Sequence, residues 1–437
     1  MLPKELNQLG ITGEEQINGK EKMLKFKSFI SEAATKGNKN LHLTHLEDSV
    51  IDGGVTGTRN VFDYLRALRD MLAGNAAAPV SVTVKWDGAP ALFAGIDPSD
   101  GKFFIAKKGV FNKNPKIYKT NAEIDNDLSG DLSDKFKVAL KEFAKLGISE
   151  GVVQGDFLFT KDDLKTETID GESYITFHPN TIVYAVPKNS SLGKRIAGSE
   201  IGVVWHTTYR GSDFESMSAS FGEKIAGKLK ETKSVWSVDA VFEDKSGNAT
   251  FTKQETEAIT KILSDAGSIF RTVKANVLNE FKNNTELNAR TNTYINSKVR
   301  DGQRVGDPKG FVIGLQRYIE EYYQKQADKV KTEKSKEAKI AQGQEILKFF
   351  DARNIKEIEK VFTLYNLLVD AKLMIIEKLN HVDGLKTFLK TKNGFEVTGQ
   401  EGFVAIDHLS GGSLKLVDRL NFSKANFSTE YIKGWQK

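Results

Sequence analysis

The stretch Val82–Gly95 constrains the fold most, because it joins an alternating strand, a turn signal and a second apolar run. Val82–Trp86 alternates with the period of a half-buried strand. Asp87-Gly88 follows directly, and Asp-Gly between two such runs is a strong short-range hairpin signal. The stretch therefore predicts a β-hairpin, with Lys85 near the end of its first strand.

Strand patterns dominate from residue 80 to about 207, with one helix expected over Asp134–Leu146. The chain then becomes helical from Lys253 to roughly Lys390. Strand patterns return at Gly402–Ile406 and Ser413–Val417. We therefore expect an α+β fold of antiparallel sheets that is interrupted by a large helical insertion.

These changes of pattern divide the chain into four expected segments. They are an N-terminal tail (1–40), a first part of the sheet domain (41–252), the helical insertion (253–395) and the completion of the sheet domain (396–437). In the first part, Thr58–Leu72 places its apolar residues on one helical face. We expect this helix to pack across the sheet that carries Lys85.

The composition excludes several kinds of chemistry. The chain has no cysteine, which rules out disulfides, thiolate metal sites and thiol nucleophiles. No apolar run approaches the roughly 18 residues of a membrane span, and no signal-peptide pattern opens the sequence. We expect no contact with a membrane. The formal net charge of +5 suits a polyanionic partner without requiring one.

Two histidines, His42 and His45, are close enough in sequence to share a metal ion. Zinc sites need three or four ligands, and no third ligand has a matching spacing. Partly buried structural histidines are the alternative interpretation.

A set of ordered motifs points to one superfamily. Lys85-x-Asp87-Gly88 is followed by Lys107-Lys-Gly, Gly-Asp156-Phe, a strand with Tyr184, Glu401-Gly-Phe-Val and Leu-Lys415-Leu. In this order the chain resembles the covalent nucleotidyltransferases, namely polynucleotide ligases and capping guanylyltransferases, and most closely the RNA ligases of tailed phages. It also resembles uncharacterised phage proteins with Lys-Trp-Asp-Gly-Ala-Pro-Ala and Glu-Gly-Phe-Val-Ala-Ile-Asp-His. The resemblance implies the nucleotidyltransferase (ligase adenylation) fold.

The resemblance implies that Lys85 attacks the α-phosphorus of ATP and forms a lysyl-AMP phosphoramidate. A free lysine has a pKa near ~10.4, so this amine needs neighbouring cations or a metal to lose its proton. Asp87 and Gly88 would shape the turn that presents it. The alternative is a lysine that lies on the surface.

Three further matches imply nucleotide contacts. Lys107 stands where the family has an arginine that binds the nucleotide, and it lacks the bidentate fork of an arginine. Asp156 would hold the ribose or assist the metal, although a simple turn aspartate is the alternative. Tyr184 would stack on the purine, or is instead a core aromatic residue, and Pro187 replaces the aspartate that usually ends this strand.

The final motifs imply metal and phosphate contacts. Glu401 would coordinate Mg²⁺ or Mn²⁺ at the phosphates, since these ions prefer oxygen ligands. Lys415 would grip the α-phosphate. Val417 replaces the second lysine of this strand, with Arg419 or Lys424 as conceivable substitutes. This departure leaves a degenerate enzyme as an alternative.

The expected function is thus an ATP-dependent polynucleotide ligase or adenylyltransferase, with RNA favoured over DNA as the nucleic-acid partner. A GTP-using capping transferase is an alternative.

Lysines within Gln324–Lys339 form a mobile or solvated segment, or contact a phosphate backbone.

A phage head-packaged or structural binding protein is the rival from another class. Phe29-Ile-Ser-Glu32 before Ala33 resembles the sites cut by head-maturation proteases. The implied location is the cytoplasm of an infected host cell, or the virion if the protein is packaged.

Overall fold

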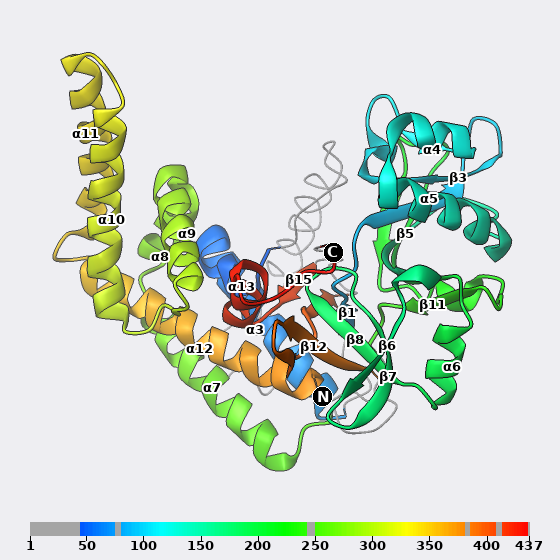
Figure 1. Cartoon of the computed structure of the whole chain (residues 1–437). Coiled ribbons are helices and arrows are strands. Elements are labelled where there is room, and N and C mark those ends of the chain that lie inside the picture. The colour runs from blue at the N-terminus through cyan, green and yellow to red at the C-terminus, as the bar shows by residue number, and fades with distance from the viewer. Residues whose placement is uncertain (1–43, 75–79, 243–249, 381–384, 408–412, 436–437) are drawn as a thin grey trace.

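The computed structural model describes residues 44–74, 80–242, 250–380, 385–407 and 413–435. Its elements form a helical layer and three sheets whose strands are mostly antiparallel. Figure 1 shows the long helices on one side of the molecule and the larger sheets on the other. The chain is a mixed α+β protein, as its sequence predicts.

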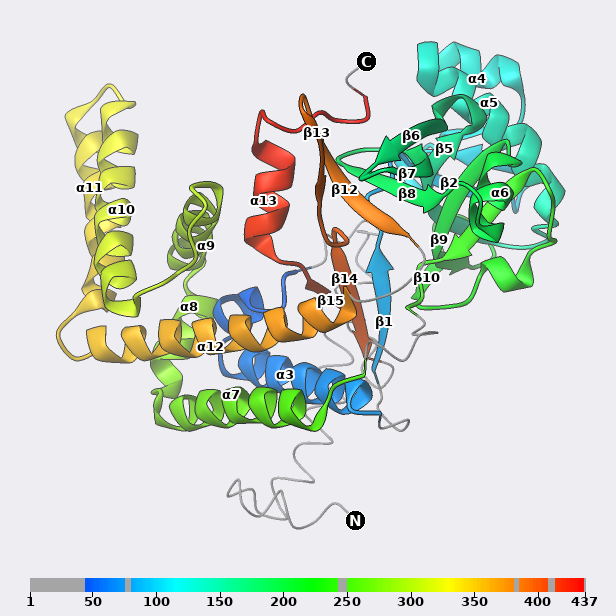
Figure 2. The ribbon, with the colours of Figure 1, turned by 60° about the horizontal axis from the view of Figure 1, so that its bottom comes forward.

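The helical layer combines one helix from before the strands with six from the middle of the chain. These are α3 (Asp48–Leu72), α7 (Lys253–Thr272), α8 (Ala275–Asn283), α9 (Thr285–Arg300), α10 (Pro308–Asp328), α11 (Glu333–Leu347) and α12 (Ile355–Leu379). Helices α3, α7 and α12 lie side by side and share one hydrophobic core (Figure 2). The hairpin of α10 and α11 extends away from the sheets (Figure 1).

Helix α3 confirms the helix expected over Thr58–Leu72 and begins earlier, at Asp48. Gly54 interrupts it with φ 57° and ψ −140°, a conformation that glycine adopts without a Cβ penalty. After the kink, Val61 and Leu65 are fully buried. They belong to the core that also contains residues of the three-stranded sheet, so α3 packs across that sheet as predicted.

Helix α12 forms because its apolar residues recur at helical spacing. Leu364, Leu368, Ala371 and Ile375 are fully buried, whereas Asp370 and Glu377 on another side of the helix are exposed. Within the described part of the chain, no helix has the length and apolar character needed to cross a membrane.

The smallest sheet brings together strands from distant parts of the sequence. Its strands are β1 (Val80–Lys85), β14 (Gly402–Asp407) and β15 (Ser413–Leu416), in the order β1-β14-β15. The hairpin predicted over Val82–Gly95 is wrong, because β1 pairs with β14 and the strand after Asp87-Gly88 joins another sheet. A local turn signal says nothing about a partner strand that comes from the far end of the chain.

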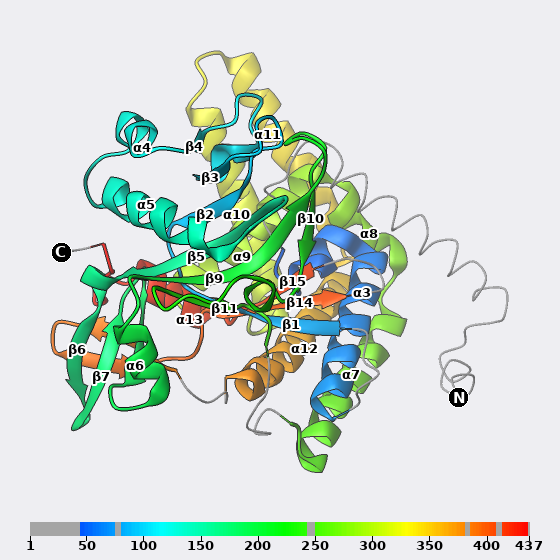
Figure 3. The ribbon, with the colours of Figure 1, turned by 90° about the vertical axis from the view of Figure 1, so that its right-hand side faces the viewer.

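The largest sheet has seven strands, in the order β10-β9-β5-β2-β3-β4, and β11 pairs parallel to β9. They are β2 (Ala91–Ile96), β3 (Phe103–Ala106), β4 (Ile117–Tyr118), β5 (Val152–Thr160), β9 (Ile201–Arg210), β10 (Ser218–Phe221) and β11 (Val235–Asp239). Helices α4 (Asn121–Asp127) and α5 (Gly130–Phe143) cover one face of it (Figure 3). Helix α5 confirms the helix expected near Asp134–Leu146.

The third sheet has five strands, in the order β13-β12-β8-β7-β6. They are β6 (Lys165–Ile169), β7 (Glu172–Phe177), β8 (Ile182–Pro187), β12 (Lys386–Thr391) and β13 (Gly394–Val397), and α6 (Ser191–Ala197) lies beside them. The helical region predicted to continue to roughly Lys390 ends earlier, at Leu379. The segment after it forms β12 and β13. The alternating Lys386–Thr391 is a strand because β8 provides its partner.

After β15 the chain forms α13 (Arg419–Phe427) and then crosses the five-stranded sheet as a C-terminal strap, residues 428–435. Tyr431 bridges to Thr391, and the Gly434 N–H donates to the Asn180 carbonyl at 2.6 Å. The strap thereby fixes the turn between β7 and β8.

Candidate functional site

The register of the three-stranded sheet separates an apolar face from a charged one. Val82, Phe403 and Leu416 belong to the core shared with α3 and α12. Thr83 lies opposite Val404, and Val404 lies opposite Lys415. Side chains alternate along a strand, so Lys85 points to the same face as Lys415. The sheet thus brings together two of the predicted site residues from distant parts of the sequence.

Lys85 forms an ion pair with Glu401, the residue just before β14. The Lys85 side chain is 31% exposed and the Glu401 side chain only 9%. Burial raises the pKa of Glu401 to about 7, although the Lys85 ammonium acts to lower it. The negative charges of Asp87 and Asp156 raise it further. Glu401 is therefore a carboxyl group that titrates near neutral pH.

Lys415 adds a second cation to this face. Its pKa is lowered, first by burial and then by the positive charge of Lys85, while the charge of Glu401 opposes the shift. Because each of these charges acts on the other groups, Lys85, Glu401 and Lys415 form one electrostatic cluster. The sequence predicted this grouping.

Asp87 ties the end of β1 to the start of β8. Its carboxylate accepts hydrogen bonds of 2.6 Å from the Asn180 side chain and from the backbone N–H groups of Thr181 and Ile182. Burial raises the pKa of this carboxyl, against those hydrogen bonds. Asp87 is only 3% exposed. It shapes the segment that follows Lys85, as expected, but by linking two sheets and without forming a hairpin turn.

Gly88 allows the chain to pass close to β5. A Cβ at Gly88 would lie 2.6 Å from the Cβ of Asp156 and 2.9 Å from the Phe157 carbonyl oxygen. Asp156 is consequently adjacent to the segment after Lys85, where the resemblance expects an acid. His206, on β9, lies with its Nε2 atom 3.7 Å from an Asp156 carboxylate oxygen. No sequence motif had pointed to His206.

Tyr184 fits the alternative interpretation of a core aromatic residue. Its side chain is completely buried, with Trp86 5.0 Å and Phe177 5.3 Å away between ring centroids. Its hydroxyl accepts a hydrogen bond from the Asp87 backbone N–H at 2.7 Å. With both faces covered, the ring cannot stack on a base, and Tyr184 instead holds the segment after Lys85 in place.

Lys107 forms an ion pair with an acidic residue of α4. Its Nζ atom lies 3.2 Å from the carboxylate of Asp127, at the end of α4. The Asp127 carboxylate is also bound by Lys116 and Tyr118, and these hydrogen bonds hold its pKa below the usual range. Lys107 thus forms an ion pair on the side of the sheet that α4 and α5 cover, and its nucleotide contact stays a prediction.

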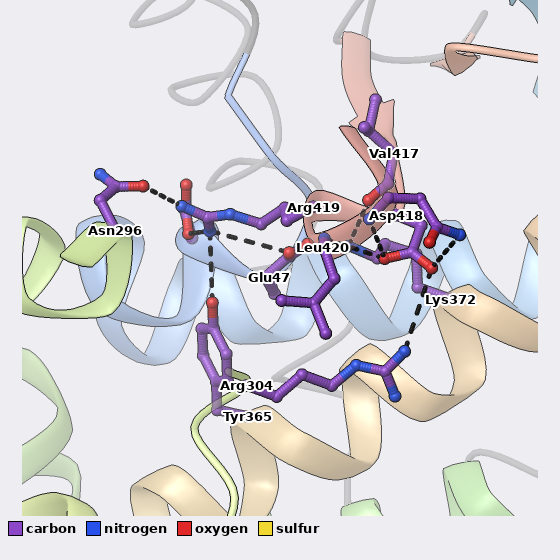
Figure 4. Close-up of polar contacts among 11 residues, drawn as sticks. Glu47, Asn296, Arg304, Tyr365, Lys372, Val417, Asp418, Arg419 and Leu420 are labelled. Atoms are coloured by element: carbon purple, nitrogen blue, oxygen red, sulfur yellow. Dashed lines mark hydrogen bonds and ion pairs between the residues drawn. The ribbon is translucent and has the colours of Figure 1, made fainter. Parts of the chain in front are cut away.

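The position of the missing second lysine is sealed inside the protein. Val417 is 2% exposed, and its carbonyl accepts a 2.9 Å hydrogen bond from Lys372 of α12 (Figure 4). Lys372 also pairs with Glu47 at 2.7 Å, and both side chains are only 1% exposed. Lys372 therefore supports the backbone beneath the site and does not face it.

Neither suggested substitute lies free to take that place. Arg419 binds Asp48 and Asn296, both at 2.5 Å, in the network that Figure 4 draws. Lys424 lies over the ring of Tyr431 in the C-terminal strap. Arg419 and Lys424 are therefore engaged elsewhere and do not replace the second lysine that the resemblance expects at Val417.

One cation near Asp87 escaped the sequence analysis. Lys433, in the C-terminal strap, donates to the Ala425 carbonyl and lies 3.5 Å from the Thr181 hydroxyl. Burial lowers its pKa, and the charge of Asp87 opposes that shift. No motif marks Lys433 or Asn180, because their proximity to Asp87 depends on how the strap crosses the β7–β8 turn.

Oxygen ligands for a divalent cation are present, but only in small number. No group of three or more acidic or histidine side chains suited to a metal occurs among residues 44–435 outside the gaps. Mg²⁺ commonly binds one or two carboxylates and completes its coordination with phosphate oxygens and water. Glu401 and Asp156 fit that pattern, because the charge of Asp156 acts on Glu401 and the two carboxylates therefore belong to one site.

The remaining expectations fall mainly outside the described residues. His42 and the stretch Phe29–Ala33 both lie there. Burial lowers the pKa of His45 to about 3, and this histidine pairs with the Lys415 backbone beside β15. His45 therefore fits the structural interpretation.

The fold and the site together define a mixed α+β protein with a half-buried lysine–glutamate pair at the end of a three-stranded sheet. The chain belongs to the family whose model matches residues 40–431 and whose description is "Family of unknown function (DUF6267)". No curated protein and no solved structure matches the chain.

Proposed function

We propose that the protein is a covalent nucleotidyltransferase of the polynucleotide ligase class, with the corresponding ligase adenylation fold. The observation that carries the proposal is the grouping of Lys85, Glu401 and Lys415 on one sheet. These residues match three family motifs from opposite ends of the sequence. A chance match at separate motifs would give no reason for them to share one cluster.

In this reaction the Lys85 amine attacks the α-phosphorus of ATP. An N–P bond forms, the bond from the α-phosphorus to the bridging oxygen breaks, and pyrophosphate leaves. The amine must first lose a proton. Glu401 forms an ion pair with Lys85, so a divalent cation that takes over this carboxylate would free the amine to lose its proton to solvent.

The other groups stabilise charge on the phosphates. Lys415 is half-buried beside Lys85, so its attraction for an α-phosphate oxygen is weakly screened. Glu401 and Asp156 would hold Mg²⁺ or Mn²⁺, an ion that neutralises phosphate charge when bound. Asp87 and Gly88 keep the lysine segment rigid through their contacts with β8 and β5.

The second half of the reaction moves AMP to a nucleic-acid 5′-phosphate, which a 3′-hydroxyl then attacks, and RNA is the favoured substrate. The lysine-rich run on the α10–α11 hairpin supports a phosphate-backbone contact, since Lys325, Lys329, Lys331 and Lys334 are exposed. The proposed location is the cytoplasm of an infected host cell.

The test is incubation with radiolabelled ATP or GTP and MgCl₂, followed by denaturing electrophoresis. Wild type is expected to retain the label covalently, and the base that works separates adenylyl from guanylyl transfer. Lys85→Ala should abolish labelling, whereas Lys102→Ala, at a side chain that is 71% exposed, should leave it intact. An unlabelled wild-type band with both nucleotides would refute the proposal.

A second candidate is a binding protein that has kept this fold without the chemistry, including one packaged in a phage head. The buried Val417 favours it, because a second phosphate-binding lysine is missing at that position. Mass spectrometry of purified virions would support packaging by finding a chain that starts at Ala33.

A further inference from the structure

A cleft of about 350 Å³ lies next to the lysine cluster. Its walls come from α12, α13, the turn before β8 and the segment that leads into β14. Asp87 and Glu401 form part of its lining. Since Glu401 also pairs with Lys85, the cleft and the lysine cluster share one wall.

The charge of the cleft opposes the binding of phosphate. Its acidic lining residues are Asp87, Glu377, Glu401 and Asp418, and its one basic lining residue in the described chain is Arg304. Arg304 approaches Asp418 to 4.0 Å (Figure 4). A triphosphate would be repelled here and attracted by Lys85 and Lys415, so a ligand that spans both places needs an uncharged half.

The remaining lining suits a flat, hydrogen-bonding group. Carboxamides, which both donate and accept, line the cleft at Asn380, Gln400, Asn421 and Asn426. The side-chain oxygen of Gln400 is buried and has no hydrogen-bond partner among the described residues. Leu373 and Phe422 add apolar surface. This mixture of apolar walls and a few polar groups is typical of small-molecule sites.

We infer that this cleft binds the nucleoside half of the triphosphate, with the base among the carboxamides and the ribose beside Glu401. The inference rests on the proposed function, because it places the uncharged part of the same substrate. In this arrangement charge separates the two halves of the nucleoside triphosphate. The phosphates lie over Lys85 and Lys415, and the nucleoside lies in the acidic cleft.

Binding of adenosine and guanosine, which have no phosphate, tests the cleft apart from the chemistry. Titration calorimetry of Lys85→Ala with each nucleoside should detect binding of one of them. Leu373→Trp should fill the cleft and weaken that binding by at least roughly tenfold. Leu367→Trp is the matched control, because Leu367 is a partly buried leucine of the same helix that does not line the cleft.

Asn421→Leu provides a second variant, at an exposed position near the start of α13. It should weaken nucleoside binding and raise the KM for ATP in the labelling assay more than it lowers kcat. Equal binding of both nucleosides to wild type, Leu373→Trp and Asn421→Leu, or no binding at all, would overturn the inference. Tight binding of inorganic tripolyphosphate that Leu373→Trp abolishes would also contradict it.

The two proposals fail in different ways. Nucleoside binding without covalent labelling would refute the enzymatic proposal and support the cleft as a nucleoside site. Labelling that neither cleft variant alters would keep the enzyme and remove the cleft as its nucleoside site. If the cleft instead holds the 3′ end of the acceptor strand, the cleft variants would join nucleic-acid ends more slowly. Their covalent labelling by the nucleotide would be unchanged.

Discussion

Two lysine–glutamate pairs flank the same three-stranded sheet and differ in their access to solvent. Lys372 and Glu47 are each 1% exposed, and Lys372 also donates to the Val417 carbonyl. Lys85 is 31% exposed, and its partner Glu401 is 9% exposed. Both pairs join a lysine to a glutamate that is distant in sequence.

This difference in solvent access decides which pair can take part in chemistry. A sealed pair cannot exchange its partner, because either charge alone would lie in a medium of low dielectric constant. The pair of Lys85 and Glu401 is partly exposed, so its ion pair can break. Solvent or a phosphate group can then replace the carboxylate as the partner of Lys85. The sealed pair is therefore structural, and the half-exposed pair is the candidate for function.

The largest expected effect comes from breaking the sealed pair. Lys372→Ala leaves the Glu47 carboxylate buried without its main partner, which should lower the free energy of unfolding by about 3–5 kcal/mol. Urea denaturation measures this change. Lys85→Ala is the comparison and should change stability by less than about 1 kcal/mol, since its side chain is partly in solvent.

The double variant Lys372→Met with Glu47→Leu sharpens this prediction. It removes both buried charges together, so it should recover most of the stability that Lys372→Ala loses. A double variant as unstable as the single one would show that the charges themselves are required.

The second effect is a dependence on pH. Glu401 has a folded pKa of about 7 against a reference of 4.5, so its contribution to stability is complete below pH 4.5 and is lost as the pH rises through 7. Glu401→Gln removes this titration. The free energy of unfolding of wild type, relative to Glu401→Gln, should fall by roughly 3 kcal/mol between pH 4.5 and pH 8. A constant difference across that range would contradict the assignment.

A third effect concerns the strap that supports the half-exposed pair. A Cβ at Gly434 would collide with the His178 carbonyl oxygen, so Gly434→Ala must displace the β7–β8 turn that holds Asp87. We expect a loss of about 1–2 kcal/mol of stability together with slower labelling of Lys85. Gly227→Ala is the control, because open space surrounds that position. Thermal unfolding and the labelling assay measure the two outcomes.

The smallest effect is expected at Lys107. This residue matches a nucleotide-binding position in the sequence but pairs with Asp127, which keeps Lys116 and Tyr118 as partners. Lys107→Ala should change the labelling rate by less than about threefold, whereas Lys415→Ala should reduce it by at least roughly a hundredfold. A large effect at Lys107 would restore the nucleotide contact that the sequence suggested.

The sequence predicted the parts of the site that local patterns encode. Lys85 and Glu401 lie in short motifs, and the strands that carry them could be recognised by alternation. Their pairing could be proposed only through the resemblance. The composition and periodicity alone gave no reason to join β1 to β14, and they favoured a hairpin instead.

The misassigned and missed residues share one physical reason, which is that their environment comes from distant segments. Tyr184 is buried because Trp86 and Phe177 cover its ring, and a strand pattern cannot reveal which aromatic residues meet. His206 and Lys433 approach Asp156 and Asp87 only through the arrangement of the sheets and the strap. No local spacing carries that information.

The pairing of β1 with β14 has a consequence for the timing of synthesis. A ribosome makes Lys85 early, yet the chain must be translated through Leu416 before Glu401 and Lys415 can join it. A nascent polypeptide that ends before residue 401 therefore carries Lys85 without its ion-pair partner. The cluster of Lys85, Glu401 and Lys415 can therefore form only after synthesis has passed Leu416.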